Sequence, residues 1–172
     1  MRDAIIISGW YWEACNVPER LALALAYSGR RVLYCDNPVS FLRHHARDLI
    51  EVEKEVFALG LKFLGHRFSA MTAVSKMQTR YLASQILITA RKLALKRPLF
   101  IYPHGEHCLT LCQEFKRRGY SLVHICMDYH LQEQMAHVQA SDLTLVIPQI
   151  AFWELRSIFG VKVQALPQMA WR

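Results

Sequence analysis

The sequence lacks the features that would assign it at once to several large classes of protein. It has no run of about 18 apolar residues, which excludes a helix that crosses a bilayer. Its first residues, Met1-Arg2-Asp3 followed by three isoleucines, are too short and too acidic for a signal peptide. Its five cysteines are odd in number and have no framework spacing, so we expect no disulfide scaffold and a reducing, cytoplasmic location.

Acidic residues are absent from one long stretch of the chain, residues 56–105. Residues 61–120 carry 11 Lys and Arg against 2 Asp and Glu, whereas the parts before and after them are close to neutral. The net charge of +7 therefore comes from the middle third, where we expect an anionic partner to bind. No RNA- or DNA-binding motif is recognisable, so we expect no nucleic-acid partner.

What the chain does contain is a sustained alternation of short apolar runs and helical segments. Residues 4–8 predict a strand buried on both faces, residues 19–28 a helix begun by Asn16 or a neighbour and ended by Gly29, and residues 31–35 a second strand. The other strands are expected at 56–63, 99–102, 121–127, 143–147 and 161–166, and the other helices at 41–49, 69–97, 106–118, 131–140 and 149–159. This order predicts an α/β fold, a doubly wound, mostly parallel, Rossmann-like sheet between two layers of helices.

The expected long helix, residues 69–97, carries the basic surface of the chain. A helix with cations on one side and apolar residues nearby can dock on anionic lipid headgroups. The alternative interpretation is an ordinary helix face in contact with water. The residues concerned are Lys76, Arg80, Arg91, Lys92 and Lys96.

The loop after the first strand lacks the glycines of a dinucleotide-binding site. That fingerprint needs three glycines, and only Gly9 is present, followed by bulky aromatic residues. The sequence therefore argues against a nicotinamide or flavin cofactor, and against another nucleotide-dependent Rossmann enzyme such as a methyltransferase. Trp10 and Trp12 are expected either to stack on a sugar or a lipid, or to pack as a loop over the edge of the sheet.

Histidines and a carboxylate follow two of the later strands. His104 and His107 come after residues 99–102, where they are placed for proton transfer or for orienting a substrate hydroxyl. Asp128 and His130 follow residues 121–127 and face the same edge, where a carboxylate can bind a sugar hydroxyl. The alternative for both groups is capping of the helix that follows each strand.

The same region contains two cysteines, Cys108 and Cys112, close to these histidines. Zinc sites usually combine a Cys-x-x-Cys pair with a distant second pair, and no such spacing is present. Four residues apart on a helix, the two cysteines are more simply small core residues. We therefore expect no metal site.

Five stretches share their order and composition with one enzyme family: residues 5–20, 29–38 (GRRVLYCDNP), 124–128 (HICMD), 140–146 (ASDLTLV) and 163–168. They resemble the N-terminal domain of GT-B glycosyltransferases, of the family-4-like type common in bacterial polysaccharide clusters. The chain departs from the family pattern where a double glycine is missing after the first strand and where the usual Pro-Asn-Gly has become Pro167-Gln168-Met169.

The resemblance implies that residues 1–168 are the acceptor-binding half of a glycosyltransferase. Residues 169–172 would begin a linker to a C-terminal donor-binding domain, without which we expect the chain to be inactive. The resemblance implies a nucleotide sugar as substrate, no cofactor, a glycan or lipid-linked acceptor, and a cytoplasmic enzyme that can be peripheral to the inner membrane.

The resemblance also implies roles for single residues. His104, with its register against His107 left open, and Asp128 would be catalytic, and Gly9 would approach the donor phosphates. The other expected substrate-binding residues are Trp10, Trp12, Arg20, His107 and His130. The alternative function is a non-enzymatic α/β module that docks on an anionic partner through residues 76–97.

Overall fold

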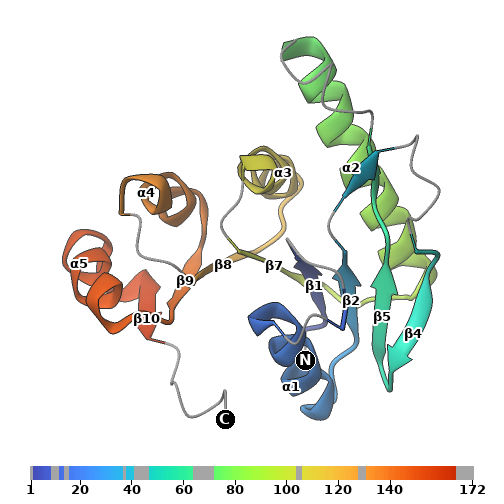
Figure 1. Cartoon of the computed structure of the whole chain (residues 1–172), viewed down its shortest axis with the longest axis horizontal. Coiled ribbons are helices and arrows are strands. Elements are labelled where there is room, and N and C mark those ends of the chain that lie inside the picture. Colours follow the sequence, from blue (N-terminus) through green and yellow to red (C-terminus); the bar gives the residue numbers. More distant parts are fainter. Residues whose placement is uncertain are drawn as a thin grey trace. The chain divides into compact units, whose positions relative to one another are not determined.

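The computed structural model describes residues 2–8, 12–13, 16–36, 38–40, 47–63, 72–103, 106–127 and 131–165. The chain forms two compact units, Met1–Pro98 and Leu99–Arg172. Each unit has mostly parallel strands flanked by helices, so the predicted α/β, Rossmann-like class is confirmed (Figure 1).

The first unit is built around the strand order β1-β2-β5-β4. β1 (Ala4–Ile7) leads through α1 (Val17–Tyr27) to β2 (Val32–Cys35), which pairs in parallel with β1 and with β5 (Val56–Leu59). Every residue of β1 and β2 is buried, as continuous apolar strands covered on both faces should be. β4 (Ile50–Glu53) is antiparallel to β5 and mostly exposed.

Both ends of α1 have the residues that the sequence predicts. The Asn16 side chain accepts a hydrogen bond from the Glu19 N–H at 2.9 Å, and Pro18 occupies the first turn, where its missing N–H costs nothing. Gly29, at φ +81°, follows the helix in a conformation that only glycine adopts easily. The Asn16 cap fixes where α1 begins, close to the carboxyl end of β1, and Gly29 lies just after its other end.

The segment between β2 and the long helix differs from the prediction. Residues 47–49 of the expected helix 41–49 are not helical, and residues 41–46 lie outside the described part. The expected strand 56–63 is two strands, β5 and β6 (Lys62–Phe63), separated at Gly60; β6 pairs in parallel with β3 (Val39–Ser40). The hairpin β4–β5 was not predicted, because the alternating charges of β4 are typical of an exposed loop as well as of an edge strand.

The long helix α2 (Thr72–Lys92) is shorter than the predicted 69–97. It ends six residues before Pro98, and Ala94 and Arg97 have φ values of +50° and +45°, which a continuing helix does not allow. The backbone therefore turns out of the helix well before Pro98.

In the second unit all strands are parallel, in the order β7-β8-β9-β10. Each crossover moves one strand further in the same direction, and crossovers between parallel strands are right-handed as a rule, so the three helices lie on one face (Figure 1). The expected last strand begins later than predicted, after a 3₁₀ turn. The elements are β7 (Leu99–Pro103), α3 (Glu106–Arg117), β8 (Leu122–Cys126), α4 (Leu131–Ala140), β9 (Leu143–Val146), α5 (Gln149–Phe159), the turn Gly160–Lys162 and β10 (Val163–Ala165).

Candidate functional site

Both residues predicted to be catalytic, and most of those predicted to bind substrate, are not placed. Gly9, Trp10, His104, Asp128 and His130 lie outside the described residues. His107 lies in α3, but its side chain is also outside the described part. Their roles remain predictions, whereas side chains at the carboxyl ends of β1 and β2 are placed and form a polar cluster.

Asp36 is the centre of this cluster. It directly follows β2, its residue is 1% exposed, and its Oδ1 accepts the Trp12 N–H at 2.9 Å. Its Oδ2 lies 3.9 Å from Arg47 Nε. Within the described part of the chain, Asp36 Oδ2 and Arg47 Nη1 are buried and make no hydrogen bond. A buried carboxylate oxygen and a buried guanidinium nitrogen with unused bonding capacity are candidates for binding a ligand.

Burial raises the pKa of the Asp36 carboxyl above its ordinary value. The Trp12 N–H and Arg47 oppose this effect, because both favour the charged carboxylate, whereas Glu13 adds to it. Glu13 also lies 3.7 Å from Arg47, so the guanidinium is shared between two carboxylates. A carboxyl with a raised pKa beside a cation can accept a hydrogen bond from a substrate hydroxyl and exchange a proton more easily than an exposed Asp.

A second group of polar contacts lies beside Asp36. Tyr34, on β2, donates its hydroxyl to Ser8 Oγ at 2.7 Å, and burial raises the pKa of that phenol. Trp12 is 8% exposed, and its ring packs edge-on against Tyr34, with the ring centroids 5.0 Å apart. Trp12 therefore contacts the protein on this side, and its stacking on a substrate remains a prediction.

The N-terminal end of α1 completes the cluster. Asn16 caps the helix and lies 3.4 Å from the Tyr34 hydroxyl, and buried Glu19 accepts the Glu13 N–H at 3.1 Å. Arg20, the next residue of the helix, is exposed. The helix end contributes a partial positive charge near the carboxylates. Sequence reasoning missed Asp36 and Arg47; the one available indication was a polar residue directly after a buried strand.

The second unit buries a group of chemically active residues in its core. The His124 and His137 rings stack with centroids 5.2 Å apart, and Tyr102 donates its hydroxyl to the His137 carbonyl at 3.1 Å. Burial raises the pKa of the Cys108 thiol to about 12 and raises that of Cys112 as well, so neither is a ready nucleophile. Among the described residues, no three His, Cys, Asp or Glu side chains form a group that could hold a metal ion.

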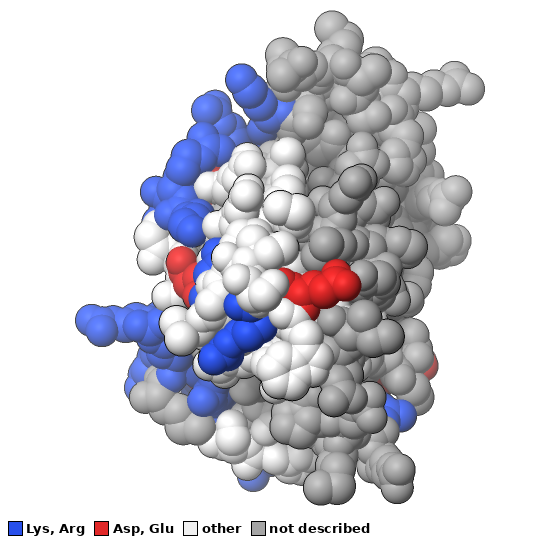
Figure 2. All heavy atoms as spheres, turned by 90° about the vertical axis from the view of Figure 1, so that its left-hand side faces the viewer, with Lys and Arg blue, Asp and Glu red and all other residues white. Residues whose placement is uncertain are grey.

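The basic surface of α2 is well defined. Lys76, Arg80, Arg91 and Lys92 are exposed, and in the described part of the chain none of the four forms an ion pair. Lys96 is exposed beyond the end of the helix. Figure 2 shows another part of the surface, where Lys and Arg gather along one margin and few Asp and Glu lie between them. No described helix is long and apolar enough to cross a membrane.

Comparison with solved structures finds related folds. The chain matches a sucrose-phosphate synthase from Thermosynechococcus elongatus with 14% identity and a TM-score of 0.63, over 96% of this chain and 88% of that one. It matches E. coli trehalose-6-phosphate synthase bound with UDP-2-fluoro glucose (9%, TM-score 0.53, 92% of this chain and 42% of that one). It also matches a UDP-forming α,α-trehalose-phosphate synthase from Burkholderia vietnamiensis, with 17% identity and a TM-score of 0.51, over 97% of this chain and 49% of that one.

These structures are GT-B glycosyltransferases, and the chain has the α/β Rossmann-like fold found in them. It spans less than half the length of the two trehalose-phosphate synthases. No known sequence family and no curated protein matches the chain. The shared fold does not distinguish a family-4-like or polysaccharide-specific type, and at this identity it does not identify a substrate.

Proposed function

We propose that this chain is the acceptor-binding half of a GT-B glycosyltransferase, which transfers a sugar from a nucleotide sugar to a glycan or lipid-linked acceptor. The observation that carries the proposal is the pair of buried Asp36 and partly buried Arg47 at the carboxyl end of β2, where each partner keeps a buried polar atom without a hydrogen bond. Open α/β sheets bind their ligands at this end of the strands. The fold that the chain shares with glycosyltransferases supports the choice of reaction.

In this proposal the pair binds hydroxyl groups of the acceptor. Asp36 Oδ2 accepts the hydrogen of one hydroxyl, and Arg47 Nη1 donates to a neighbouring oxygen. His104 takes the proton of the attacking hydroxyl, Asp128 holds a second hydroxyl, and Gly9 allows close approach of the donor phosphates. A donor-binding domain that follows residue 168 would bring the nucleotide sugar, so the proposal needs no cofactor.

The Trp12 amide is the natural reporter for this site, because its N–H is donated to Asp36. We expect methyl α-glucoside, methyl α-mannoside or methyl β-galactoside to shift the Trp12 amide resonance of the ¹⁵N-labelled chain, with a millimolar Kd. Asp36→Asn should weaken that binding at least tenfold. The exposed carboxylate of Asp48 offers a matched control, since Asp48→Asn should leave it unchanged.

Calorimetric titration with UDP-glucose and GDP-mannose tests the assignment to the acceptor half. We expect at most weak binding, because half of the donor cleft belongs to the other domain. Tight binding of either nucleotide sugar to this chain alone would overturn the assignment, and so would the failure of all three methyl glycosides to move the Trp12 amide.

A second candidate function is docking on an anionic membrane surface, such as the inner face of a bacterial membrane, through α2. The specific observation is that three large apolar side chains, Met77, Tyr81 and Ile88, are exposed on the same helix as its four cations. At about 100° per residue, all of these side chains fall within an arc of about 160°. Cations beside exposed apolar groups, with no carboxylate on the helix, suit anionic headgroups above an apolar layer.

Flotation with phosphatidylglycerol and phosphatidylcholine vesicles tests this docking. We expect binding to the anionic vesicles only, loss of binding in Arg80→Glu/Arg91→Glu, and weaker binding in Ile88→Ser, which leaves the charge unchanged. Arg20→Glu/Lys54→Glu is the charge-matched control, because both residues are exposed and lie outside α2. Equal binding to both kinds of vesicle would rule out electrostatic docking.

A further inference from the structure

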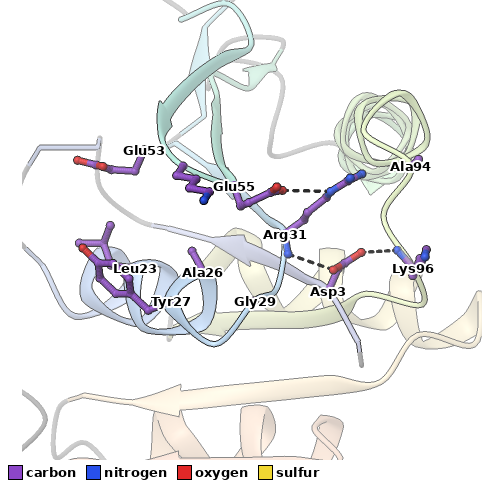
Figure 3. A pocket seen from close by; sticks show the side chains of 11 residues that line it. Asp3, Leu23, Ala26, Tyr27, Gly29, Arg31, Glu53, Glu55, Ala94 and Lys96 are labelled. Atoms are coloured by element: carbon purple, nitrogen blue, oxygen red, sulfur yellow. Dashed lines mark hydrogen bonds and ion pairs between the residues drawn. The ribbon is translucent and has the colours of Figure 1, made fainter.

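The first unit contains a pocket at the end of the sheet opposite Asp36. Its volume is about 670 Å³, and it lies where β1, β2 and β5 begin and where α1 and α2 end (Figure 3). Arg31 precedes β2 and Asp36 follows it, so the two ends lie about 17 Å apart at about 3.3 Å per residue. The pocket is therefore separate from the proposed acceptor site.

The inner wall of the pocket is held together by its own charged groups. Asp3 Oδ1 accepts the Arg31 N–H at 3.1 Å, and its Oδ2 accepts the Lys96 N–H. The Arg31 guanidinium bonds to Glu55 at 3.1 Å and to the Leu93 carbonyl at 3.0 Å. Figure 3 shows these contacts as a chain from Lys96 through Asp3 and Arg31 to Glu55. In this wall the charges of Asp3, Arg31 and Glu55 are therefore paired with protein groups.

The other lining groups are available to a ligand. Glu53, Lys54 and Lys96 are exposed, and within the described part of the chain their side chains make no hydrogen bond or ion pair. Tyr27 is 88% exposed and lines the pocket from α1 together with Leu23 (Figure 3). The pocket thus offers a hydrogen-bond acceptor, two donors and an aromatic ring with an uncovered face.

The charges of the lining residues balance, which favours a neutral ligand. Three carboxylates, of Asp3, Glu53 and Glu55, face three cations, of Arg31, Lys54 and Lys96, so the formal charge is zero. The carboxyl ends of α1 and α2 add partial negative charge, which disfavours anions such as phosphates. Hydroxyl groups both donate and accept, so a polyhydroxylated ligand can use carboxylate and ammonium groups together.

We infer that this pocket is a second carbohydrate-binding site, which takes a neutral mono- or disaccharide unit with one ring face against Tyr27. An aromatic side chain presents an apolar face to the C–H groups of a pyranose and leaves its hydroxyls free for the polar lining. The volume falls within the range of about 300–1,000 Å³ that is usual for small-molecule sites. The choice of a sugar over other neutral polyols rests on the proposed glycosyl transfer.

Titration of the ¹⁵N-labelled chain with maltose, cellobiose and N-acetylglucosamine tests the site. We expect at least one of them to shift the amides of Tyr27 and Lys54 with a millimolar Kd. Tyr27→Ala should weaken this binding at least tenfold, and Tyr27→Phe should keep it, because the ring face is retained. Tyr81→Ala, which removes an exposed tyrosine from α2, is the matched control.

Three results would overturn the site. None of the three sugars shifts the two amides at 50 mM, the shifts persist in Tyr27→Ala, or glucose 6-phosphate binds there more tightly than glucose. Because Tyr27 is almost fully exposed, its replacement should leave the fold unchanged, which the melting temperature checks. The Trp12 amide reports the acceptor site in the same spectra, so failure of either site is seen independently of the other.

Discussion

The two ends of the first unit's sheet each carry a carboxylate that holds a distant segment by its backbone. At one end Asp3 accepts the N–H groups of Arg31 and Lys96, and at the other Asp36 accepts that of Trp12. Asp3 is partly exposed, whereas Asp36 is buried and its pKa is raised. The same kind of hydrogen bond is therefore a structural clamp where water reaches the carboxylate, and it leaves unused binding capacity where the carboxylate is buried.

The largest expected effect comes from removing each carboxylate. Asp36→Ala leaves the Trp12 N–H and the Arg47 guanidinium without their buried partner, which should cost about 1–3 kcal/mol of unfolding free energy. Asp3→Ala breaks two bonds, but water can replace the lost oxygens, so we expect a cost of about 1 kcal/mol or less. Urea unfolding of both variants measures the difference. Equal losses of unfolding free energy in the two variants would show that the burial of Asp36 does not make its bonds more important than those of Asp3.

Asp36→Asn should change how the stability of the chain depends on pH. The asparagine oxygen can still accept the Trp12 N–H, but its amide does not ionise in this range. Because the folded pKa of Asp36 is raised above the unfolded value of about 3.9, the native state binds more protons between these two values. The wild type should therefore lose stability relative to Asp36→Asn as the pH rises through that window, by about 1.4 kcal/mol for each pH unit that separates the folded from the unfolded pKa.

Thermal unfolding between pH 3.5 and 8 measures this difference. Asp3→Asn is the control. It also replaces a carboxylate that accepts backbone N–H groups, but at the other end of the sheet. A stability difference between wild type and Asp36→Asn that stays constant over the whole range would contradict the raised pKa.

The regular part of this fold could be predicted from local patterns. The N-cap at Asn16, the glycine after α1 and the continuous apolar strands all follow from neighbouring residues. The β4–β5 hairpin could not, because its turn has no glycine and Glu55 adopts φ +64° instead. The Glu55 side chain meets Arg31, 24 residues away in the chain, and no local pattern contains that contact.

The candidate site was only partly predictable for the same reason. The sequence predicts that polar residues after buried strands gather at one edge of the sheet, and for the residues that it names this stays a prediction. It does not indicate that Asp36 meets the Trp12 backbone and Arg47, because two loops bring these groups together. The pocket at the opposite end was missed altogether, since its lining comes from turns and helix ends that have no motif.

A smaller effect is expected from Asn16→Ala, which tests how far the cap of α1 supports the buried end of the sheet. Loss of the bond to the Glu19 N–H should cost about 1 kcal/mol of unfolding free energy. The helix α5 gives a comparison within the same chain, because its N-cap residue, Pro148, makes no side-chain cap bond. Pro148→Ala should therefore change stability much less than Asn16→Ala in the same urea titration.

An effect of similar size is expected at Glu55, on the exposed end of the sheet. Glu55→Gly and Glu55→Ala both remove the ion pair with Arg31, but only glycine adopts φ +64° without strain. The alanine variant should be close to the wild type, because it keeps the same backbone strain and the half-exposed ion pair contributes little. The glycine variant should be more stable than the alanine variant by about 1 kcal/mol. If both variants were equally destabilised, the ion pair with Arg31 would outweigh the backbone strain at Glu55. The exposed end of the sheet would then depend on its charges as strongly as the end with Asp36 does.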